Sequence, residues 1–193
     1  MTEAPGAAAA TLPRRSPLWQ DAVSLLTGYA PTDPQQREWR AAYLCALEDD
    51  LAIFKPGPPV HLTASCLVLD EARERVLLTF HGKAHKWLQF GGHLEVTDPS
   101  VHAAAVRETR EESGIGSITV SPDIVQLHRH ALGARFGRCE AHLDVRFVGS
   151  APPGADPVCS PESLAVRWWP IGALPDDLED EIRTLITLAR SHG

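Results

Sequence analysis

Three glutamates lie close together in the segment 107–112, which reads RETREE. On a helix of 3.6 residues per turn, Glu108, Glu111 and Glu112 stand at positions i, i+3 and i+4 and therefore share one face. Their charges repel one another, and the negative end of the helix dipole adds to that repulsion. A divalent cation would relieve it, because carboxylate oxygens are the ligands that Mg²⁺ and Mn²⁺ prefer. We interpret this face as a site for Mg²⁺ (or Mn²⁺), whose coordination shell a phosphate-bearing substrate would complete.

The alternative is a solvated acidic face that Arg107 and Arg110 neutralise. Exposed ion pairs at i, i+4 spacing contribute only about 0.3–0.5 kcal/mol each. Context favours the metal site, since a glycine pair, Gly91 and Gly92, precedes the charged segment and a short strand leads into those glycines.

A helix over about 99–113 must position these glutamates. Asp98-Pro99 supplies a capping side chain followed by proline at the first helical position, and Gly114 suits a terminator. Alanines at 103–105 form a side that can be buried. We expect the three carboxylates to project from the last two turns of this helix.

The segment 92–115 resembles the Nudix box. That pattern is glycine, five residues, glutamate, seven residues, and then Arg-Glu-aliphatic-any-Glu-Glu-any-Gly-aliphatic. The matching positions are Gly92, Arg107, Glu108, Glu111, Glu112, Gly114 and Ile115. Similar strand patterns and the ending VRWWP, LP and a helix extend the resemblance over about 60–190. The chain departs from the pattern in three ways: Asp98 replaces glutamate, one extra residue precedes Arg107, and Thr109 replaces the aliphatic residue.

The resemblance implies an α+β fold in which a mixed β-sheet is sandwiched between α-helices (α/β/α). It also implies hydrolysis of a diphosphate linkage in a nucleoside diphosphate derivative, with Mg²⁺ required. By this resemblance Arg107 orients Glu108, and a backbone carbonyl at Gly91 or Gly92 adds a metal ligand. The implied carboxylate ligands are Glu108, Glu111 and Glu112.

The general base is expected outside the box. Glu162, in a loop before the tryptophan-bearing strand, is the first candidate and Glu140 the second, because loops over a sheet often deliver catalytic groups. Strand alternation puts residues 140, 142, 144 and 146 on one polar face, which either lines a cleft or faces solvent. A basic turn before the box could hold phosphate or stack on a base, or be merely exposed. The expected substrate-binding residues are Glu140, His142, Asp144 and Trp87.

The chain divides into three parts by its patterns. Residues 1–15 are expected to be a disordered tail, 16–58 an N-terminal helical extension, and 59–193 the Nudix domain. Two helices should open at Ser16-Pro17 and Asp33-Pro34, where a cap precedes proline. Strands are expected in 61–70, 75–80, 86–90, 118–120, 123–130, 140–149 and 165–170, with an amphipathic helix from about 175.

Composition narrows the class of protein. A length of 193 residues suits one domain, and a net charge of −7 makes nucleic acid an unlikely partner. No apolar run approaches the roughly 20 residues that span a bilayer, so we expect no membrane association and a cytoplasmic location. A homodimer stays open. The four cysteines form no CxxC pair and the nine histidines show no zinc spacing, so no zinc site is predicted.

Two further functions stay open as alternatives. One is a Nudix-fold nucleotide-binding or regulatory module without catalysis, which the altered loop 96–99 suggests. The other is an isomerase of prenyl diphosphates, for which a cysteine and histidine ligand arrangement would be expected, and the sequence shows none.

Overall fold

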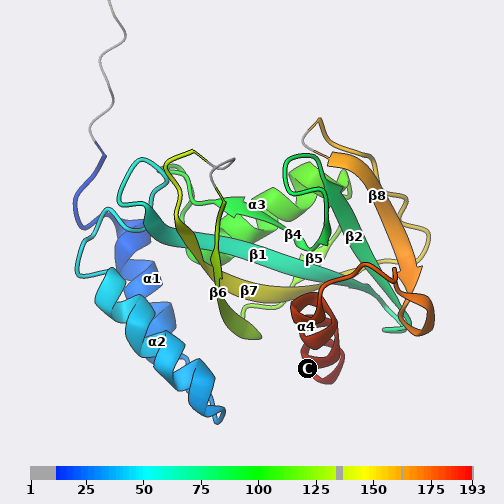
Figure 1. The fold of residues 1–193 in the computed structure, drawn as a ribbon, viewed down its shortest axis with the longest axis horizontal. Coiled ribbons are helices and arrows are strands. Elements are labelled where there is room, and N and C mark those ends of the chain that lie inside the picture. Colours follow the sequence, from blue (N-terminus) through cyan, green and yellow to red (C-terminus); the bar gives the residue numbers. More distant parts are fainter. Residues whose placement is uncertain (1–11, 134–136, 162, 193) are drawn as a thin grey trace, which may run out of the picture.

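The computed structural model describes residues 12–133, 137–161 and 163–192 (Figure 1). Most of the predicted tail, residues 134–136 between the expected strands 123–130 and 140–149, and Glu162 therefore lie outside the described residues. Within the described part, no helix is long and apolar enough to cross a bilayer.

The first two helices begin where the sequence predicts. Helix α1 spans Pro17–Gly28 and α2 spans Pro34–Ala46. The Ser16 hydroxyl accepts a hydrogen bond from the Trp19 amide at 3.1 Å, and the Asp33 carboxylate accepts one from the Gln36 amide at 2.9 Å. Each cap satisfies an amide that the first helical turn leaves without a partner.

The strands form one mixed sheet. Its order is β3-β2-β1-β7-β5, with β4 also on β1, β6 on β7 and β8 on β2. Strands β1 and β7 pair in parallel and the other pairs are antiparallel. The strands are β1 Val60–Asp70, β2 Arg75–His81, β3 Trp87–Leu88, β4 Phe90–His93, β5 Thr119–Val120, β6 Gln126–Ala131, β7 Ala141–Ala151 and β8 Ser163–Pro170.

Helices cover both faces of this sheet, as Figure 1 shows. Helix α3 (Val101–Ser113) packs on the face that carries Ala64 and Cys66 of β1, and α4 (Asp180–Ser191) packs on the opposite face, against Leu67 and Leu69. A short 3₁₀ turn, Ile171–Ala173, links β8 to α4. Strand alternation produces these two apolar clusters from one strand. The predicted α+β fold with an α/β/α arrangement is confirmed.

The start of α3 differs from the prediction. The cap is Ser100, whose hydroxyl accepts a hydrogen bond from the Ala103 amide at 3.0 Å, and not Asp98. The predicted end is confirmed, because Gly114 adopts the left-handed conformation (φ 70°) that terminates helices. The carboxylate oxygens of Asp98 instead accept hydrogen bonds from the side chain of Arg107 and from the Glu95 amide.

Candidate functional site

A cavity of about 1200 Å³ opens on the sheet face that carries Thr63 and Ser65. Its floor comes from the middle of the sheet, and its rim comes from the turn after β2 and the segment before β7. The residues that line it include Lys55, Thr63, Ser65, Lys83, Lys86, Gly91, Gly92, His93, Glu108, His130, Cys139, His142, Asp144, Arg146 and Glu181. Charged groups of both signs therefore surround one space.

The glycine pair holds two of the predicted glutamates. The Gly91 amide donates a hydrogen bond to the Glu112 carboxylate at 3.1 Å. A methyl group at Gly92 would lie 2.7 Å from the Glu108 carboxylate, so only glycine leaves room for that side chain. Strand β4 thus meets α3 at two carboxylates, of which Glu108 lines the cavity.

The third glutamate lies at the surface. Glu111 has a side chain that is 60% exposed, and its carboxylate pairs with Arg107 Nη1 at 3.2 Å. Neither Glu111 nor Glu112 lines the cavity in the part of the chain that the structure describes.

Arg107 joins the box helix to the loop before it. Its Nη1 donates to Glu108 at 2.9 Å, and its Nη2 donates to the His93 carbonyl oxygen at 3.1 Å. Its Nε and Nη2 donate to the two carboxylate oxygens of Asp98 at 2.9 and 3.0 Å. The hydrogen bonds to Asp98, and then the charge of Glu108, raise the pKa of Arg107 above its usual value. The guanidinium therefore holds the Glu108 carboxylate in place beside Gly92.

The altered loop supplies the partner of that arginine. Asp98 is 7% exposed, and besides Arg107 it accepts a hydrogen bond from the Glu95 amide at 2.8 Å. Glu95 itself is 59% exposed and its carboxylate lies 3.9 Å from Arg107. The residue that replaces the pattern's glutamate is thus used to anchor Arg107.

An ion pair lies beneath the cavity floor. Asp144 is 2% exposed and Arg146 is 1% exposed, with Arg146 Nε 3.0 Å from the Asp144 carboxylate. Thr63 and Ser65 donate to the same carboxylate at 3.1 and 2.7 Å, and Gln89 donates at 3.2 Å. Burial alone would raise the pKa of Asp144, but Arg146 and the hydrogen bonds outweigh it and lower that pKa. Asp144 is held as a carboxylate with its oxygens already occupied.

The remaining predicted substrate residues fall in different places. His142 lines the cavity together with Asp144. Glu140 is exposed just before β7 and is not among the lining residues, and Trp87 packs edge-on against Trp169 with ring centroids 5.3 Å apart. Glu162 lies outside the described residues. Of the four candidates that the structure describes, it therefore brings two, His142 and Asp144, to the cavity.

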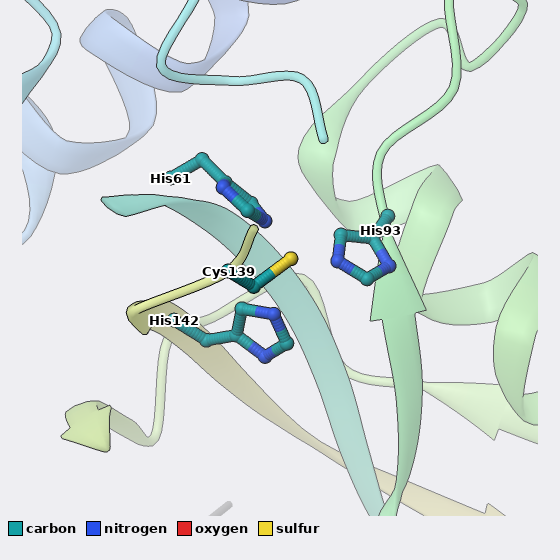
Figure 2. A group of neighbouring side chains, drawn as sticks. All are labelled: His61, His93, Cys139 and His142. Atoms are coloured by element: carbon teal, nitrogen blue, oxygen red, sulfur yellow. The ribbon is translucent and has the colours of Figure 1, made fainter. Parts of the chain in front are cut away.

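The sequence patterns did not predict one group of neighbouring residues in the structure. The side chains of His61, His93, Cys139 and His142, which we call the histidine–cysteine cluster, converge on one another (Figure 2), and His93, Cys139 and His142 also line the cavity. The available signal was weak: two residues separate Cys139 from His142, whereas the other two members come from distant strands.

Comparisons with known proteins agree with this architecture. The NUDIX domain family model matches residues 59–188. A NUDIX family hydrolase from Clostridium perfringens is 25% identical, with a TM-score of 0.54 over 67% of this chain and 95% of that one. The dihydroneopterin triphosphate pyrophosphohydrolase of E. coli is 20% identical (TM-score 0.55; 66% and 92% covered), and a C. elegans Ap4A hydrolase is 18% identical (TM-score 0.53; 66% and 93% covered). A search among curated proteins found no significant match.

Proposed function

The chain belongs to the NUDIX domain family, and on that basis we propose that it is a metal-dependent hydrolase of a diphosphate linkage in a nucleoside-diphosphate-type substrate. Members of this family cleave pyrophosphate bonds in nucleoside diphosphate derivatives. In this proposal water attacks phosphorus, and the chain supplies the groups that hold the metal and the substrate.

One observation carries the proposal most directly. The Glu108 carboxylate lies against Gly92 at the cavity wall, where a side chain at position 92 would displace it. Arg107 holds that carboxylate at 2.9 Å, and Asp98 holds Arg107 in turn. Such preorganisation is expected of a ligand whose position matters for chemistry.

The donor set fits a hard divalent cation. The Glu108 carboxylate lies beside Gly92, and the Glu112 carboxylate bonds the Gly91 amide. Glu111 lies one helical turn after Glu108, and its side chain is exposed. We propose these three glutamates and the Gly92 carbonyl oxygen as the ligands of Mg²⁺ or Mn²⁺. A divalent cation bound there would neutralise the diphosphate and lower the pKa of a bound water.

Basic residues complete the substrate site in this proposal. Lys55 and Lys83 line the same cavity as Glu108, so their charges can attract the phosphate groups. Asp144, whose oxygens already accept hydrogen bonds from several donors, positions the floor and is a poor proton acceptor. We propose Glu162 as the general base, with Glu140 as its rival.

Turnover of a substrate panel tests the proposal. The panel contains nucleotide sugars, ADP-ribose, dinucleoside polyphosphates, nucleoside triphosphates and a pterin triphosphate, each with and without Mg²⁺. We expect Mg²⁺-dependent cleavage of at least one compound at a phosphoanhydride bond. On that substrate Glu162→Gln should lower kcat by about 10²–10⁴-fold and Glu140→Gln should not.

Two other results would overturn the proposal. Nucleotide binding in calorimetry with no cleavage across the panel would identify a binding module. Because the structure gathers histidines and a cysteine, the panel also includes a prenyl diphosphate. Migration of its double bond without release of phosphate would identify an isomerase.

A further inference from the structure

We propose that the histidine–cysteine cluster, formed by His61, His93, Cys139 and His142, is a binding site for Zn²⁺, separate from the glutamate site. One ring nitrogen of each histidine and the cysteine sulfur lie within 4.8 Å of one another. Figure 2 shows the four side chains pointing toward a shared centre from three strands and the segment before β7.

Sheet geometry brings these residues together. His61 and His142 are register partners at the starts of the parallel strands β1 and β7, so their side chains leave the same face side by side. His93 at the end of β4 lies opposite Thr63, which is two residues from His61 and on that same face. The backbone positions alone therefore place three imidazoles around one point.

Backbone hydrogen bonds also fix the fourth residue. The Glu140 amide, which follows Cys139 directly, donates to the Pro59 carbonyl oxygen at 2.9 Å. This bond ties the segment before β7 to the start of β1. Cys139 is 7% exposed and is a free thiol.

The imidazole nitrogens lack the partners that a buried polar atom normally has. Among the described residues, the Nε2 atoms of His61, His93 and His142 are buried and have no hydrogen-bond partner. Leaving such an atom without a partner destabilises the folded protein, because the hydration that it loses on burial is not replaced. The rings pack against one another with centroids 4.9 to 5.2 Å apart, which gives their carbon atoms van der Waals contacts but gives these nitrogens no hydrogen bond. A shared cation would satisfy all three.

The protonation states suit a metal. The Nδ1 of His61 lies 2.9 Å from the Pro58 carbonyl oxygen, which can only accept, so Nδ1 carries the proton and Nε2 keeps its lone pair. A neutral imidazole whose second nitrogen keeps its lone pair is the form that coordinates metals.

The donor types select the ion. Three imidazoles and a thiolate are borderline to soft ligands, which favour Zn²⁺ over the Mg²⁺ that the glutamates would hold. In a tetrahedral zinc site the ligand atoms lie roughly 3.3–3.6 Å apart, so the most distant pair must close by about 1 Å. Rotation of the imidazoles and of the Cys139 side chain can supply that movement.

Four protein ligands make a closed, structural site. His93 connects it to the proposed chemistry, because its carbonyl oxygen accepts a hydrogen bond from Arg107 at 3.1 Å. Bound Zn²⁺ would thus fix the end of β4 and the cavity wall beside Glu108. Loss of Zn²⁺ is therefore expected to lower the thermal stability of the protein more than it alters the geometry of the glutamate site.

Metal analysis of the untagged full-length chain tests the proposal. We expect about one zinc per chain after dialysis, and Co²⁺ substitution should give tetrahedral d–d absorption together with a thiolate charge-transfer band. Cys139→Ser should abolish that band and weaken Zn²⁺ binding by at least about tenfold, since even loss of an outer-shell contact costs 10–100-fold. Cys159→Ser, at an exposed cysteine, is the matched control and should behave as the wild type.

A second readout keeps the test independent of activity. At the same concentration, Zn²⁺ should raise the Tm of the chelator-treated wild type by more than it raises the Tm of Cys139→Ser or His142→Ala. Glu108→Gln should keep its zinc, so failure of the hydrolase proposal and failure of this one are distinguishable. The proposal is overturned if the wild type binds no zinc, or if Cys139→Ser keeps both the charge-transfer band and the wild-type affinity.

Discussion

Arg107 is the residue on which the proposed glutamate site depends most. It contacts Glu108, Glu111, Asp98 and the His93 carbonyl oxygen with a single guanidinium. A planar fork can make these contacts at once, which a lysine cannot. Asp98 stands where the Nudix pattern has a glutamate, one residue further from Arg107 than in the pattern. It is buried and bonds the Arg107 guanidinium, so the altered loop still holds that side chain in place.

Asp98→Asn should show what this anchor contributes. The amide keeps one acceptor oxygen but loses the charge that pairs with Arg107, so we expect the free energy of unfolding to fall by about 1.5–3 kcal/mol. If Glu108 loses its position as a result, kcat should fall between about tenfold and a hundredfold. Urea denaturation and steady-state kinetics measure the two effects.

Glu95→Gln is the control for that substitution. It neutralises an acid of the same loop, which is exposed and lies 3.9 Å from Arg107, so its effect on the free energy of unfolding should stay within about 0.5 kcal/mol. Equal effects of the two substitutions would contradict the anchoring role of Asp98.

Residue spacing predicted that three glutamates share one face of a helix, but it did not predict the histidine–cysteine cluster. The spacing of Glu108, Glu111 and Glu112 along one helix is a local property that can be read from the chain. The cluster depends on which residue of β1 lies beside which residue of β7, about 80 positions later, and that register is set by the packing of the whole sheet. The prediction that the cysteines and histidines hold no zinc relied on local spacing alone.

At the scale of elements, the glycine pair determines how closely β4 can approach its two neighbours, β1 and α3. The two glycines face different neighbours. A methyl group at Gly91 would lie 2.4 Å from the Ser65 Cβ and 2.7 Å from the Ala64 carbonyl oxygen, whereas at Gly92 it would meet the end of the Glu108 side chain. Backbone of an adjacent strand cannot give way, but a carboxylate can.

The two alanine substitutions should therefore differ in kind. Gly91→Ala should push β4 from β1 and lower the free energy of unfolding by about 1–3 kcal/mol or more. Gly92→Ala should displace Glu108 and lower kcat strongly, with a smaller loss of stability. Thermal unfolding and kcat, measured on both variants, separate the effects. Equal losses of stability with unchanged kcat in Gly92→Ala would contradict the placement of Glu108.

Element boundaries were predictable where the signal is local. Ser16-Pro17 and Asp33-Pro34 start helices as predicted, because each capping side chain accepts a hydrogen bond from an amide of the first turn that follows it. Asp98-Pro99 has the same signal and fails, since Arg107 from the helix itself takes the carboxylate and Ser100 caps instead. A tertiary contact overrode a local rule, and it did so at the candidate site.

At the scale of the whole molecule, the N-terminal helices are part of the main core, although the family model begins at residue 59. Leu18, Leu26 and Tyr43 belong to the same apolar cluster as α3 and the sheet. Gln36 of α2 bonds both backbone groups of Leu127 in β6: its Nε2 donates at 2.9 Å and its Oε1 accepts at 2.7 Å. Helix α2 thereby covers an edge of the sheet, which would otherwise expose unpaired backbone. The domain boundaries themselves stay a prediction.

Gln36→Ala should therefore destabilise the protein. It leaves the Leu127 amide and carbonyl without their partner, so the free energy of unfolding should fall by about 1–3 kcal/mol in urea denaturation. Gln35→Ala is the matched control, because Gln35 is exposed and bonds only to the neighbouring Glu38 among the described contacts. If both variants unfold at the same urea concentration as the wild type, α2 does not protect that edge.

Magnesium-dependent turnover by Glu108→Gln tests the central claim most directly. With the best substrate of the panel, the wild type should require Mg²⁺ or Mn²⁺, and Glu108→Gln should lose at least about a hundredfold in kcat. Its thermal stability should stay close to that of the wild type. Wild-type turnover without any divalent cation, or full activity in Glu108→Gln, would contradict the account.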